Sequence, residues 1–575
     1  MALSPRGLPL TYATSMPHAA KLALVILAAA AVYLVGIGRV QLFDRDEPRN
    51  AQAARQMLQS GDWVVPRLLD KVRTAKPPFT YWCQASVMSF IGDGSGGWGD
   101  TAAARLPSVV AMMLTLIVLG VVLTRYVDRE RAFWTVLILA TSGIVIGFLA
   151  KGSMHDALLL LWVTIAQMCL YAILRGHGTW PVVITMAVAI ALAGLTKGPV
   201  VLGVMATTLI ALAILSWLGR RAQASLPEEA RARRPSYVAV KVIVALAIVA
   251  AIVAPWAWLV EHRSPGFLFT SVSNEVLRRI AEPLEQHKGP PGYYLLTVWG
   301  TYFPWSVLLP LAMVVAWRHR DEPMIRFALA AVIGPWLMFE IVKTKLPHYL
   351  LPTFPPLAFL TADAIVRCLR GEHDDLITKG TRGAIVAWGV IVIGMGVAPW
   401  LTPAKLDRPP IVVMLAFSFV AALYAAAVIV PFLRRRPRAG LIAMGVGMMP
   451  AMMIIWGFYL PSAHFLRLSG CVGDLLKQNG GGPRDTRVGD VQMIGYKEPS
   501  LAFHQGGTIR EQSDDAFLAH TPLEQWPRFM TIRDDLWQTT PSAAKEQLEV
   551  IGSCRGIAYA AGGKTWTVWV VRTKR

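Results

Sequence analysis

Charged side chains are scarce in this chain of 575 residues, and their scarcity excludes a soluble protein. Only 16% of the residues are Asp, Glu, Lys or Arg, whereas a soluble domain carries about 25%. Hydrophobic residues make up 54% of the sequence, and the mean hydropathy is +0.47. This composition is typical of an integral membrane protein.

Acidic residues are also few relative to basic ones. The chain has 36 Asp and Glu against 56 Lys and Arg, which gives a formal net charge of +20. The basic residues are divided among many loops rather than gathered on one face, so nucleic acid is not an expected partner. The expected partners of this charge are membrane lipids with anionic headgroups.

Cysteine is rare as well. The sequence has five, and no pair of them has the spacing of a metal site. Cys471 and Cys554 fall in a polar C-terminal tail that the topology below places outside the cell, where oxidation is permitted. They either pair there or stay free, since the sequence does not fix the distance between them.

Long apolar runs are what the sequence has in abundance. Each run is close to the roughly 20 residues that cross the hydrocarbon of a bilayer, and they recur over the first 460 residues or so. We predict about thirteen spans, at 19–38, 105–125, 131–150, 155–174, 180–196, 199–217, 238–259, 298–317, 324–342, 349–368, 383–401, 411–433 and 440–460.

Arginine clusters in the short loops orient these spans. Arg125, Arg220, Arg318 and Arg434 each lie in a cluster on the same predicted side. The positive-inside rule places that side in the cytoplasm. The N-terminus is then inside, and the C-terminal tail is outside.

The expected fold is mainly α, a polytopic transmembrane helical bundle with a small C-terminal α/β domain. We assign residues 1–462 to the membrane domain, which carries two long outside loops at 39–104 and 260–297. Residues 463–575 form the tail domain, because charged residues return there at the density of a soluble protein. Strands are predicted at 488–494 and 565–571, the second after a hairpin turn at Gly562-Gly563-Lys564.

The first outside loop packs charge directly against a membrane exit, which is costly and usually marks a site. Asp46, Glu47 and Arg49 follow the first apolar run, and a cationic cluster ending at Lys76 comes about twenty residues later. Helices lying on the membrane surface are predicted at 47–58 and from Pro77 onward. They are separated by an extended segment at 63–66 and followed by a flexible glycine-rich hinge at 92–99. Carboxylates beside a cationic cluster suit the handling of an anionic, phosphorylated lipid.

Four segments carry a family resemblance. They are Asp46-Glu47-Pro48-Arg49-Asn50-Ala51-Gln52, Gly61-Asp62-Trp63-Val64-Val65-Pro66, Lys76-Pro77-Pro78 and the run Lys343-Thr344-Lys345-Leu346-Pro347-His348-Tyr349-Leu350-Leu351-Pro352. Together they resemble the bacterial lipid A 4-amino-4-deoxy-L-arabinose transferases, which are integral-membrane glycosyltransferases of the GT-C type. The chain departs from the family pattern at Asn50 and Gln52, where the family has Tyr and Glu, and at Ala75, where a Glu is expected.

The resemblance implies a reaction and a location. The donor is an undecaprenyl-phosphate sugar, and the acceptor is a phosphate of lipid A. The enzyme is a multi-pass protein of the bacterial inner membrane, with its active site and tail domain in the periplasm. The leaving group is a lipid phosphate, so cations are needed to absorb charge as the glycosidic bond breaks.

The resemblance and the loop charges together select the candidate site. We expect catalytic roles for the acids Asp46, Asp156 and Glu47, with Asp46 the foremost as a base or as a positioning group. Substrate-binding roles are expected for Lys76, Arg49, Lys345, His348, Tyr349, Tyr81 and Arg279. No cofactor is firmly implied, and a divalent metal held by His262 and His287 with a loop carboxylate stays open.

Structural roles compete with each of these assignments. Asp46, Glu47 and Asp156 are also typical helix N-terminal acids, and Lys345, His348 and Tyr349 are typical of an interfacial anchor. Two other functions remain as alternatives. One is a same-fold enzyme that moves another sugar, such as mannose or an aminosugar, to a protein or surface glycan. The other is a lipid or sugar transporter, although a transporter places its ionisable residues nearer mid-membrane.

Overall fold

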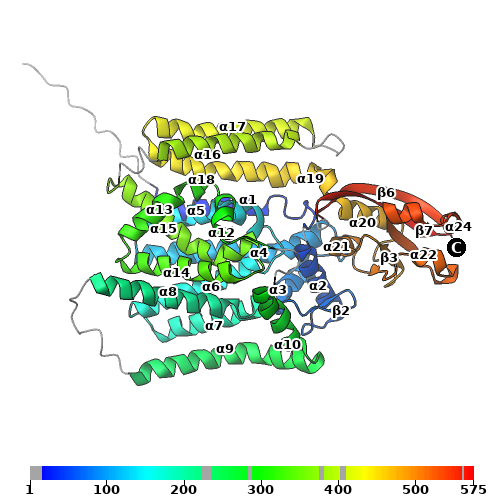
Figure 1. The fold of residues 1–575 in the computed structure, drawn as a ribbon, viewed down its shortest axis with the longest axis horizontal. Coiled ribbons are helices and arrows are strands. Elements are labelled where there is room, and N and C mark those ends of the chain that lie inside the picture. Colours follow the sequence, from blue (N-terminus) through cyan, green and yellow to red (C-terminus); the bar gives the residue numbers. More distant parts are fainter. Residues whose placement is uncertain are drawn as a thin grey trace, which may run out of the picture.

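Apolar helices build most of the protein (Figure 1), seen in a computed structural model that describes residues 16–43, 45–222, 235–282, 288–373, 381–401, 409–559 and 562–574. Ten helical segments within these ranges are long and apolar enough to cross a membrane. They are formed by α4 (Trp98–Tyr126), α6 (Asp156–Leu174), α7 (Trp180–Lys197), α8 (Val200–Ala222), α9 (Pro235–Arg263), α14 (Pro323–Ile341), η6 with α15 (Pro347–Thr353 and Phe354–Leu369), α16 with η8 (Thr381–Val397 and Ala398–Leu401), α17 (Ile411–Leu433), and α18 with η9 and α19 (Pro437–Ile454, Ile455–Tyr459 and Leu460–Ser462). The chain is a multi-pass membrane protein.

Three of the predicted spans are occupied by shorter elements. Helix α1 (His18–Leu34) and the pair η5 (Trp305–Leu308) and α13 (Leu309–Arg318) are apolar but shorter than the ten, and α5 (Arg129–Thr141) is followed by the π-helix η1 (Val145–Leu149). The polytopic helical bundle is therefore confirmed, whereas the count of about thirteen spans stays a prediction.

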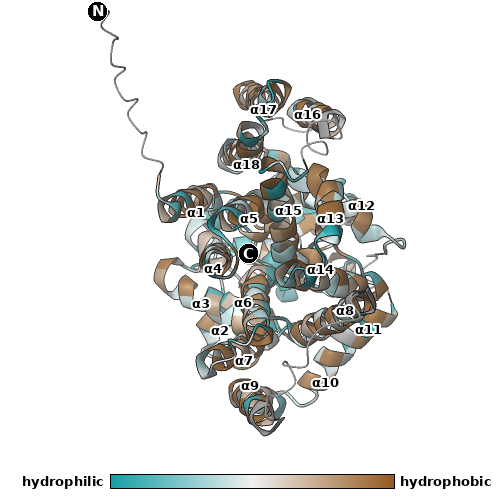
Figure 2. Cartoon of the chain, turned by 90° about the vertical axis from the view of Figure 1, so that its left-hand side faces the viewer, coloured by the Kyte–Doolittle hydropathy of each residue, from teal (hydrophilic) through white to brown (hydrophobic). Residues whose placement is uncertain are grey.

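The outer faces of the bundle are hydrophobic, as lipid contact requires. Viewed from the end opposite the C-terminal sheet, the peripheral helices α9, α16 and α17 carry broad apolar surfaces (Figure 2). On α9, Ile243, Leu246 and Trp258 are largely exposed. Because the hydrocarbon of a bilayer is as apolar as these side chains, exposure there carries no penalty.

The C-terminal part forms a five-stranded mixed sheet in the order β4-β3-β5-β7-β6. Strands β3 and β4 and strands β3 and β5 pair in parallel, while β7 pairs antiparallel with both β5 and β6. The strands are β3 (Val491–Ile494), β4 (Arg510–Glu511), β5 (Phe529–Arg533), β6 (Leu548–Ala558) and β7 (Lys564–Thr573), and the accompanying helices are η10 (His464–Leu466), α20 (Leu468–Gln478), α21 (Pro499–Gln505), α22 (Phe517–His520), η11 (Leu523–Gln525), α23 (Asp534–Thr539) and α24 (Ser542–Glu546). A small C-terminal α/β domain is present, as predicted.

A disulfide fastens one helix of this domain to the sheet. Cys471 on α20 is bonded to Cys554 on β6, with 6.1 Å between their Cα atoms. The sequence left this pairing open, and the structure resolves it. The predicted hairpin is also present, since Gly562 and Gly563 adopt positive φ angles between β6 and β7.

The first long loop lies between the bundle and the sheet domain, whereas α10 (Phe267–Val272) of the second lies beside α9 (Figure 1). The first contains α2 (Asp46–Ser60), the short hairpin β1 (Arg67–Leu68) and β2 (Lys71–Val72), and α3 (Phe79–Ile91). The second contains α10, the π-helix η3 (Ser273–Leu277), α11 (Arg278–Ala281) and α12 (Tyr293–Thr301).

Helix α2 differs in setting from the predicted surface helix. Ala51 and Ala54 are fully buried, because α3 and α21 pack on α2. The segment expected to be extended at 63–66 is a bend instead. There the Asp62 carboxylate accepts hydrogen bonds from the backbone N–H groups of Val64 and Val65, a local turn that competes with extended backbone.

The glycine-rich stretch predicted as a hinge is docked. The Asp100 carboxylate accepts the N–H groups of Asp93, Gly94 and Gly96. A Cβ at Gly96 would stand 2.1 Å from the Phe503 carbonyl oxygen of α21, and the φ angle there is +75°. Only glycine fits such an approach. Arg55 completes the junction with bonds of 3.0 Å to Asp100 and 2.9 Å to the Phe503 carbonyl.

Candidate active site

A cavity of about 520 Å³ opens where the second loop meets helices α7, α8, α9 and α14. One part of its wall is apolar and includes Leu159, Ile190, Val253 and Phe339. The remainder carries a cluster of ionisable and hydroxyl side chains, namely Lys76, Asp156, Lys197, Glu275, Arg279 and Tyr349. A site that is apolar along one wall and charged at the other suits a lipid with a polar headgroup.

Glu275 stands at the centre of the cationic group. Its carboxylate forms an ion pair with Lys76, and it accepts hydrogen bonds from Arg279 at 3.1 Å to Nε and 3.2 Å to Nη2. The Arg279 Nη1 atom donates to the Tyr349 hydroxyl at 2.9 Å. Burial raises the pKa of Glu275, but the charges of Lys76 and Arg279 outweigh this and hold it below its usual value.

These side chains come from three separate elements. Lys76 precedes α3, Glu275 and Arg279 lie one turn apart on η3 and α11, and Tyr349 lies on the 3₁₀ turn η6. Burial lowers the pKa of Lys76, and Glu275 offsets this only in part. The sequence assignments of Lys76, Arg279 and Tyr349 to one site therefore agree with where the structure places them.

Asp156 and Lys197 form a second ion pair in the same wall. Asp156 begins α6, Lys197 ends α7, and 2.6 Å separates the carboxylate Oδ1 from the ammonium Nζ. The ammonium also lies 5.1 Å from the centre of the Tyr349 ring. Both helices are candidate spans, so the pair sits at an end of each.

Asp46 lies in the first turn of α2 and is not part of the cavity wall. Its Oδ1 is 3.6 Å from the Arg49 Nη1 atom, and its side chain is 43% exposed. Partial burial raises the pKa of Asp46, but the positive charges of Arg73, Lys76 and Arg49 outweigh it and lower the pKa below its usual value. The carboxylate is thus ionised and within the field of the cavity cations.

Tyr81 does not line the 520 Å³ cavity. The Arg73 Nε atom donates to the Tyr81 hydroxyl at 3.0 Å, and Arg73 Nη2 donates to the Asn50 side-chain oxygen at 3.1 Å. Asn50 in turn contacts His155, with 3.3 Å between Nδ2 and Nδ1. Asn50, a departure from the family pattern, therefore connects Arg73 to His155.

Glu47 has a different setting from its neighbour Asp46. Both of its oxygens are engaged by the buried Arg105, at 3.0 Å to Nε and 3.0 Å to Nη2. They also accept the backbone N–H groups of Phe43 and Ser153, each at 2.7 Å. Glu47 thus holds α2 to α4 and to the loop before α6, and the structure does not bring it to the 520 Å³ cavity.

Lys345 and His348 are likewise outside that cavity wall. The Lys345 ammonium binds Glu340 at 2.7 Å and is only 6% exposed. His348 stacks on Phe148 at 5.7 Å and meets the Tyr349 ring edge-on at 5.1 Å. Glu340 also accepts the backbone N–H of Gly292 at 2.7 Å, so the Lys345–Glu340 pair anchors the second loop, whereas His348 packs against Tyr349.

A second cavity, of about 460 Å³, lies on the other side of this stack. It is mostly apolar, and its wall includes Phe43, Gly147, Phe148, Met452 and Trp456 together with Glu47. The π-helices η1 and η9 both contribute to it, and π-turns in helices are frequent at functional sites. Phe148 thus forms part of this wall, while its stacking partner His348 contacts Tyr349 of the first cavity.

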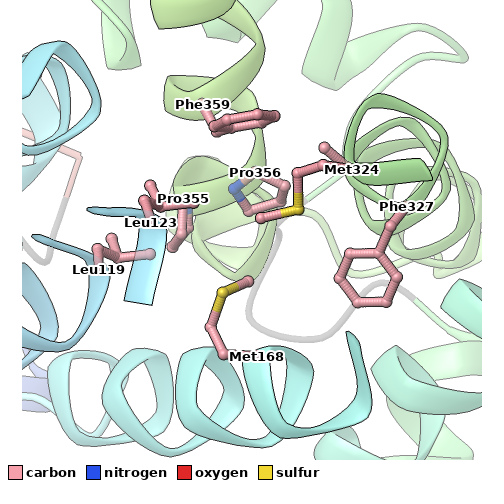
Figure 3. Close-up of a pocket in the computed structure, with 9 residues that line it drawn as sticks. Leu119, Leu123, Met168, Met324, Phe327, Pro355, Pro356 and Phe359 are labelled. Carbon is pink, nitrogen blue, oxygen red and sulfur yellow. The ribbon is translucent and has the colours of Figure 1, made fainter. Parts of the chain in front are cut away.

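A third void, deep in the bundle, is too small to bind a ligand. Figure 3 shows it between Met168, Met324, Phe327 and Phe359, with an all-apolar lining. Its volume is about 10 Å³, at most the size of one water molecule, and an apolar void stays dry.

Lys197 and Glu275 line the cavity but are not among the residues predicted from the sequence. A lysine between two apolar runs, such as Lys197, is by default a functional candidate. Glu275 carried no local signal beyond its position four residues before Arg279, which is typical of any surface helix. Within the described residues no group of three His, Cys, Asp or Glu side chains is arranged to hold a metal. His262 stacks on Trp258, and His287 lies outside the described residues.

The known proteins to which this chain is similar are glycosyltransferases. Residues 21–270 match the family described as dolichyl-phosphate-mannose-protein mannosyltransferase. The undecaprenyl phosphate-alpha-4-amino-4-deoxy-L-arabinose arabinosyl transferase of Serratia proteamaculans is 28% identical over 415 residues, which cover 70% of this chain and 71% of that protein. The protein of the same name from Yersinia enterocolitica is 31% identical, with 65% of each chain covered, slightly less than two thirds of its length.

Solved structures agree with these matches at the level of the fold. The crystal structure of ArnT from Cupriavidus metallidurans bound to undecaprenyl phosphate superposes with a TM-score of 0.70 at 19% identity, over 96% of this chain and 97% of that one. The same protein in the apo state gives a TM-score of 0.70 at 18% identity. The predicted GT-C-type architecture is confirmed.

Proposed function

We propose that this chain, a glycosyltransferase similar to the enzymes that use lipid-phosphate-linked sugars, transfers 4-amino-4-deoxy-L-arabinose from undecaprenyl phosphate to a phosphate of lipid A. The single observation that carries the proposal is the cation group of the 520 Å³ cavity. Lys76 and Arg279 converge there on one anionic group beside an apolar wall.

The donor phosphate takes the place that a carboxylate now holds. An arginine fork and a lysine point charge are the usual partners of a phosphate, and Tyr349 adds a hydroxyl already bonded to Arg279. The prenyl chain lies along the apolar wall formed by residues such as Leu159 and Phe339. As the bond from the anomeric carbon to the phosphate oxygen breaks, negative charge grows on that oxygen, and these cations stabilise it.

Asp46 is proposed to act on the acceptor side of the reaction. A phosphate acceptor is already ionised near neutral pH, so Asp46 is not needed to remove a proton from it, and it orients the reacting groups instead. A hydroxyl acceptor would use the same carboxylate as a general base. Glu47 is a positioning residue, because its ion pair with Arg105 fixes the start of α2.

The acceptor lipid is proposed to occupy the 460 Å³ cavity. That cavity is apolar enough for acyl chains, and Phe148, which lines it, stacks on His348 beside Tyr349 of the donor cavity. A transfer between two lipids needs two such apolar sites whose polar ends meet. The Phe148–His348 stack is where we place that meeting.

The site is proposed to face the periplasm of a bacterial inner membrane. Helix α4 begins beside the sheet domain at Trp98 and runs for 29 residues to Tyr126, next to the arginine cluster at Arg125. A helix of this length spans about 43 Å, so this arginine cluster and the sheet domain lie at opposite ends of the bundle. The positive-inside rule then puts the sheet and both cavities outside.

Mass spectrometry of lipid A from cells with and without this chain tests the proposal. We expect a species heavier by one aminopentose only in cells that express it. The family match is named for a protein mannosyltransferase, which makes a protein hydroxyl the second candidate acceptor. Unmodified lipid A together with a newly glycosylated membrane protein would favour that second function.

A further inference from the structure

Two carboxylates line the donor cavity; Asp156 pairs with Lys197 there, while Glu275 binds the cations that the reaction needs. Glu275 lines the cavity and is 17% exposed, and its two carboxylate oxygens contact Lys76 and Arg279. These are the two cations to which the donor phosphate is assigned. The cavity therefore contains an anion of the chain itself where the phosphate is expected.

The phosphate and Glu275 compete for the same donors. Arg279 gives Nε and Nη2 to Glu275 and Nη1 to Tyr349. A phosphate that engages the guanidinium in a fork must displace one of these partners. Because two carboxyl–guanidinium bonds and the Lys76 ion pair all end on Glu275, displacement of Glu275 frees the largest number of donors.

A displaced Glu275 needs another cation. A buried carboxylate without a partner is strongly disfavoured, and the remaining cation of the wall, Lys197, is engaged by Asp156 at 2.6 Å. Three cations and two carboxylates line the cavity. A donor that brings one negative charge alone would leave Glu275 to share cations with the phosphate.

We propose that Glu275 is the specificity residue for the sugar amine, and that it exchanges its ion pairs with Lys76 and Arg279 for one with the ammonium group when the donor binds. This inference rests on the proposed function, because an aminosugar linked to a phosphate carries both charges. The phosphate takes the two cations, and the ammonium takes the carboxylate. The phosphate then keeps both cations, whereas a neutral sugar on the same lipid would leave Lys76 and Arg279 to be divided between the phosphate and Glu275.

Two features of the chain fit an exchange of this kind. Glu275 lies on the π-helix η3 between α10 and α11, a geometry frequent at functional sites. The cations already hold the pKa of Glu275 below its usual value, and an ammonium group would keep the carboxyl ionised in the same way after the exchange.

The test compares sugar transfer from two donors by the purified full-length chain. The donors are undecaprenyl phosphate carrying either 4-amino-4-deoxy-L-arabinose or L-arabinose, which has a hydroxyl in place of the amine. Wild-type enzyme is expected to prefer the amino donor in kcat/KM, and Glu275→Gln to lose about tenfold or more of that preference, as expected for a lost hydrogen bond between charged groups. Glu275→Asp should retain part of it.

Binding of undecaprenyl phosphate alone separates specificity from a structural role. This lipid has no amine, so in wild-type protein it competes with Glu275 for Lys76 and Arg279. The Glu275→Gln variant should therefore bind it several-fold more tightly, whereas damage to the site would weaken binding. Glu282→Gln is the matched control, since Glu282 is 62% exposed and pairs with Arg278 outside the cavity wall.

The possible results distinguish the role of Glu275 from the transferase function. An unchanged preference in Glu275→Gln, or weaker binding of undecaprenyl phosphate, would overturn the role of Glu275 while leaving the transferase function in place. A wild-type enzyme that transfers arabinose but not the amino sugar would contradict the proposed function itself, and with it the ammonium ligand.

Discussion

Asp156 and Lys197 join two apolar helices through an ion pair of 2.6 Å, in the wall of the cavity assigned to the donor. The side chains are 5% and 14% exposed. A buried pair is costly to break, since removing one partner strands the other charge. Breaking this contact should therefore affect both the stability of the protein and transfer at the donor cavity, and the two effects can be measured separately.

Asp156→Asn and Lys197→Met should each destabilise the protein by about 3 kcal/mol, while the double variant should regain most of that loss. Transfer should stay low in all three, because the cavity wall loses the Lys197 cation, the Asp156 carboxylate or both. Thermal unfolding in detergent and a transfer assay measure the two effects. A double variant as active as wild type would show that the pair is structural only.

Asp46 and Glu47 are adjacent in sequence and are predicted to differ in role. Asp46→Asn should lower transfer by about a hundredfold, because the carboxylate orients the reacting groups, and change stability by less than about 1 kcal/mol. Glu47→Gln should instead cost about 3 kcal/mol of stability, because it leaves the buried Arg105 without its carboxylate. Circular dichroism during heating, alongside the transfer assay, distinguishes them. Full activity in Asp46→Asn would remove it from the mechanism.

Two glycines allow each cavity to be filled separately. Gly147 lines the 460 Å³ cavity, where an added Cβ would come no closer than 3.9 Å to Met452, and Gly194 lines the 520 Å³ cavity with no atom within 4 Å. Gly147→Leu should raise the KM for lipid A about tenfold, and Gly194→Leu should weaken binding of undecaprenyl phosphate about tenfold. Each variant controls for the other. If both affected the same substrate, the assignment of two lipids to two cavities would be wrong.

Acid should loosen the contact between the sheet domain and the first loop through His504. Burial lowers the pKa of His504 to about 4, from a usual value of 6.5, and its ring bonds the Gly96 carbonyl at 3.2 Å. A lowered folded-state pKa means that the unfolded chain binds the proton first. Stability should therefore be unaffected above pH 6.5, fall between pH 6.5 and about 4, and lose on the order of 3 kcal/mol from this group.

The His504→Asn variant isolates this effect, because an amide keeps a donor for Gly96 but does not titrate. Its unfolding temperature should vary less between pH 7.5 and 5 than that of wild type. Identical pH profiles for the two proteins would show that His504 does not couple acid to docking.

The sequence predicted the bundle, the tail domain and the gathering of Lys76, Arg279 and Tyr349, because hydropathy and short motifs are local signals. It did not predict that Asp46 and Glu47 have different partners. Neighbouring positions on a helix face different directions, and the partner that distinguishes them, Arg105, comes 58 residues later. Burial of α2 was missed for the same reason, since α21, which packs on it, lies more than 400 residues away.

Glu275 and Lys197 illustrate a second limit. Each is an ordinary charged residue in its own segment, and only the fold brings Glu275 to Lys76 and Lys197 to Asp156. The glycine-rich stretch at 92–99 shows the converse case. Its composition is typical of a flexible linker, yet the Asp100 carboxylate and α21 determine its conformation.

Lys76 and Arg279 are proposed to hold the donor phosphate, and equilibrium binding of undecaprenyl phosphate tests this directly. Lys76→Met and Arg279→Gln should each weaken binding about tenfold or more, as expected for loss of a charged hydrogen-bond donor. Arg278→Gln, which removes a cation that is 55% exposed and outside the cavity wall, should change it little. Equal affinity in wild type, Lys76→Met and Arg279→Gln would contradict the assignment of this cavity to the donor.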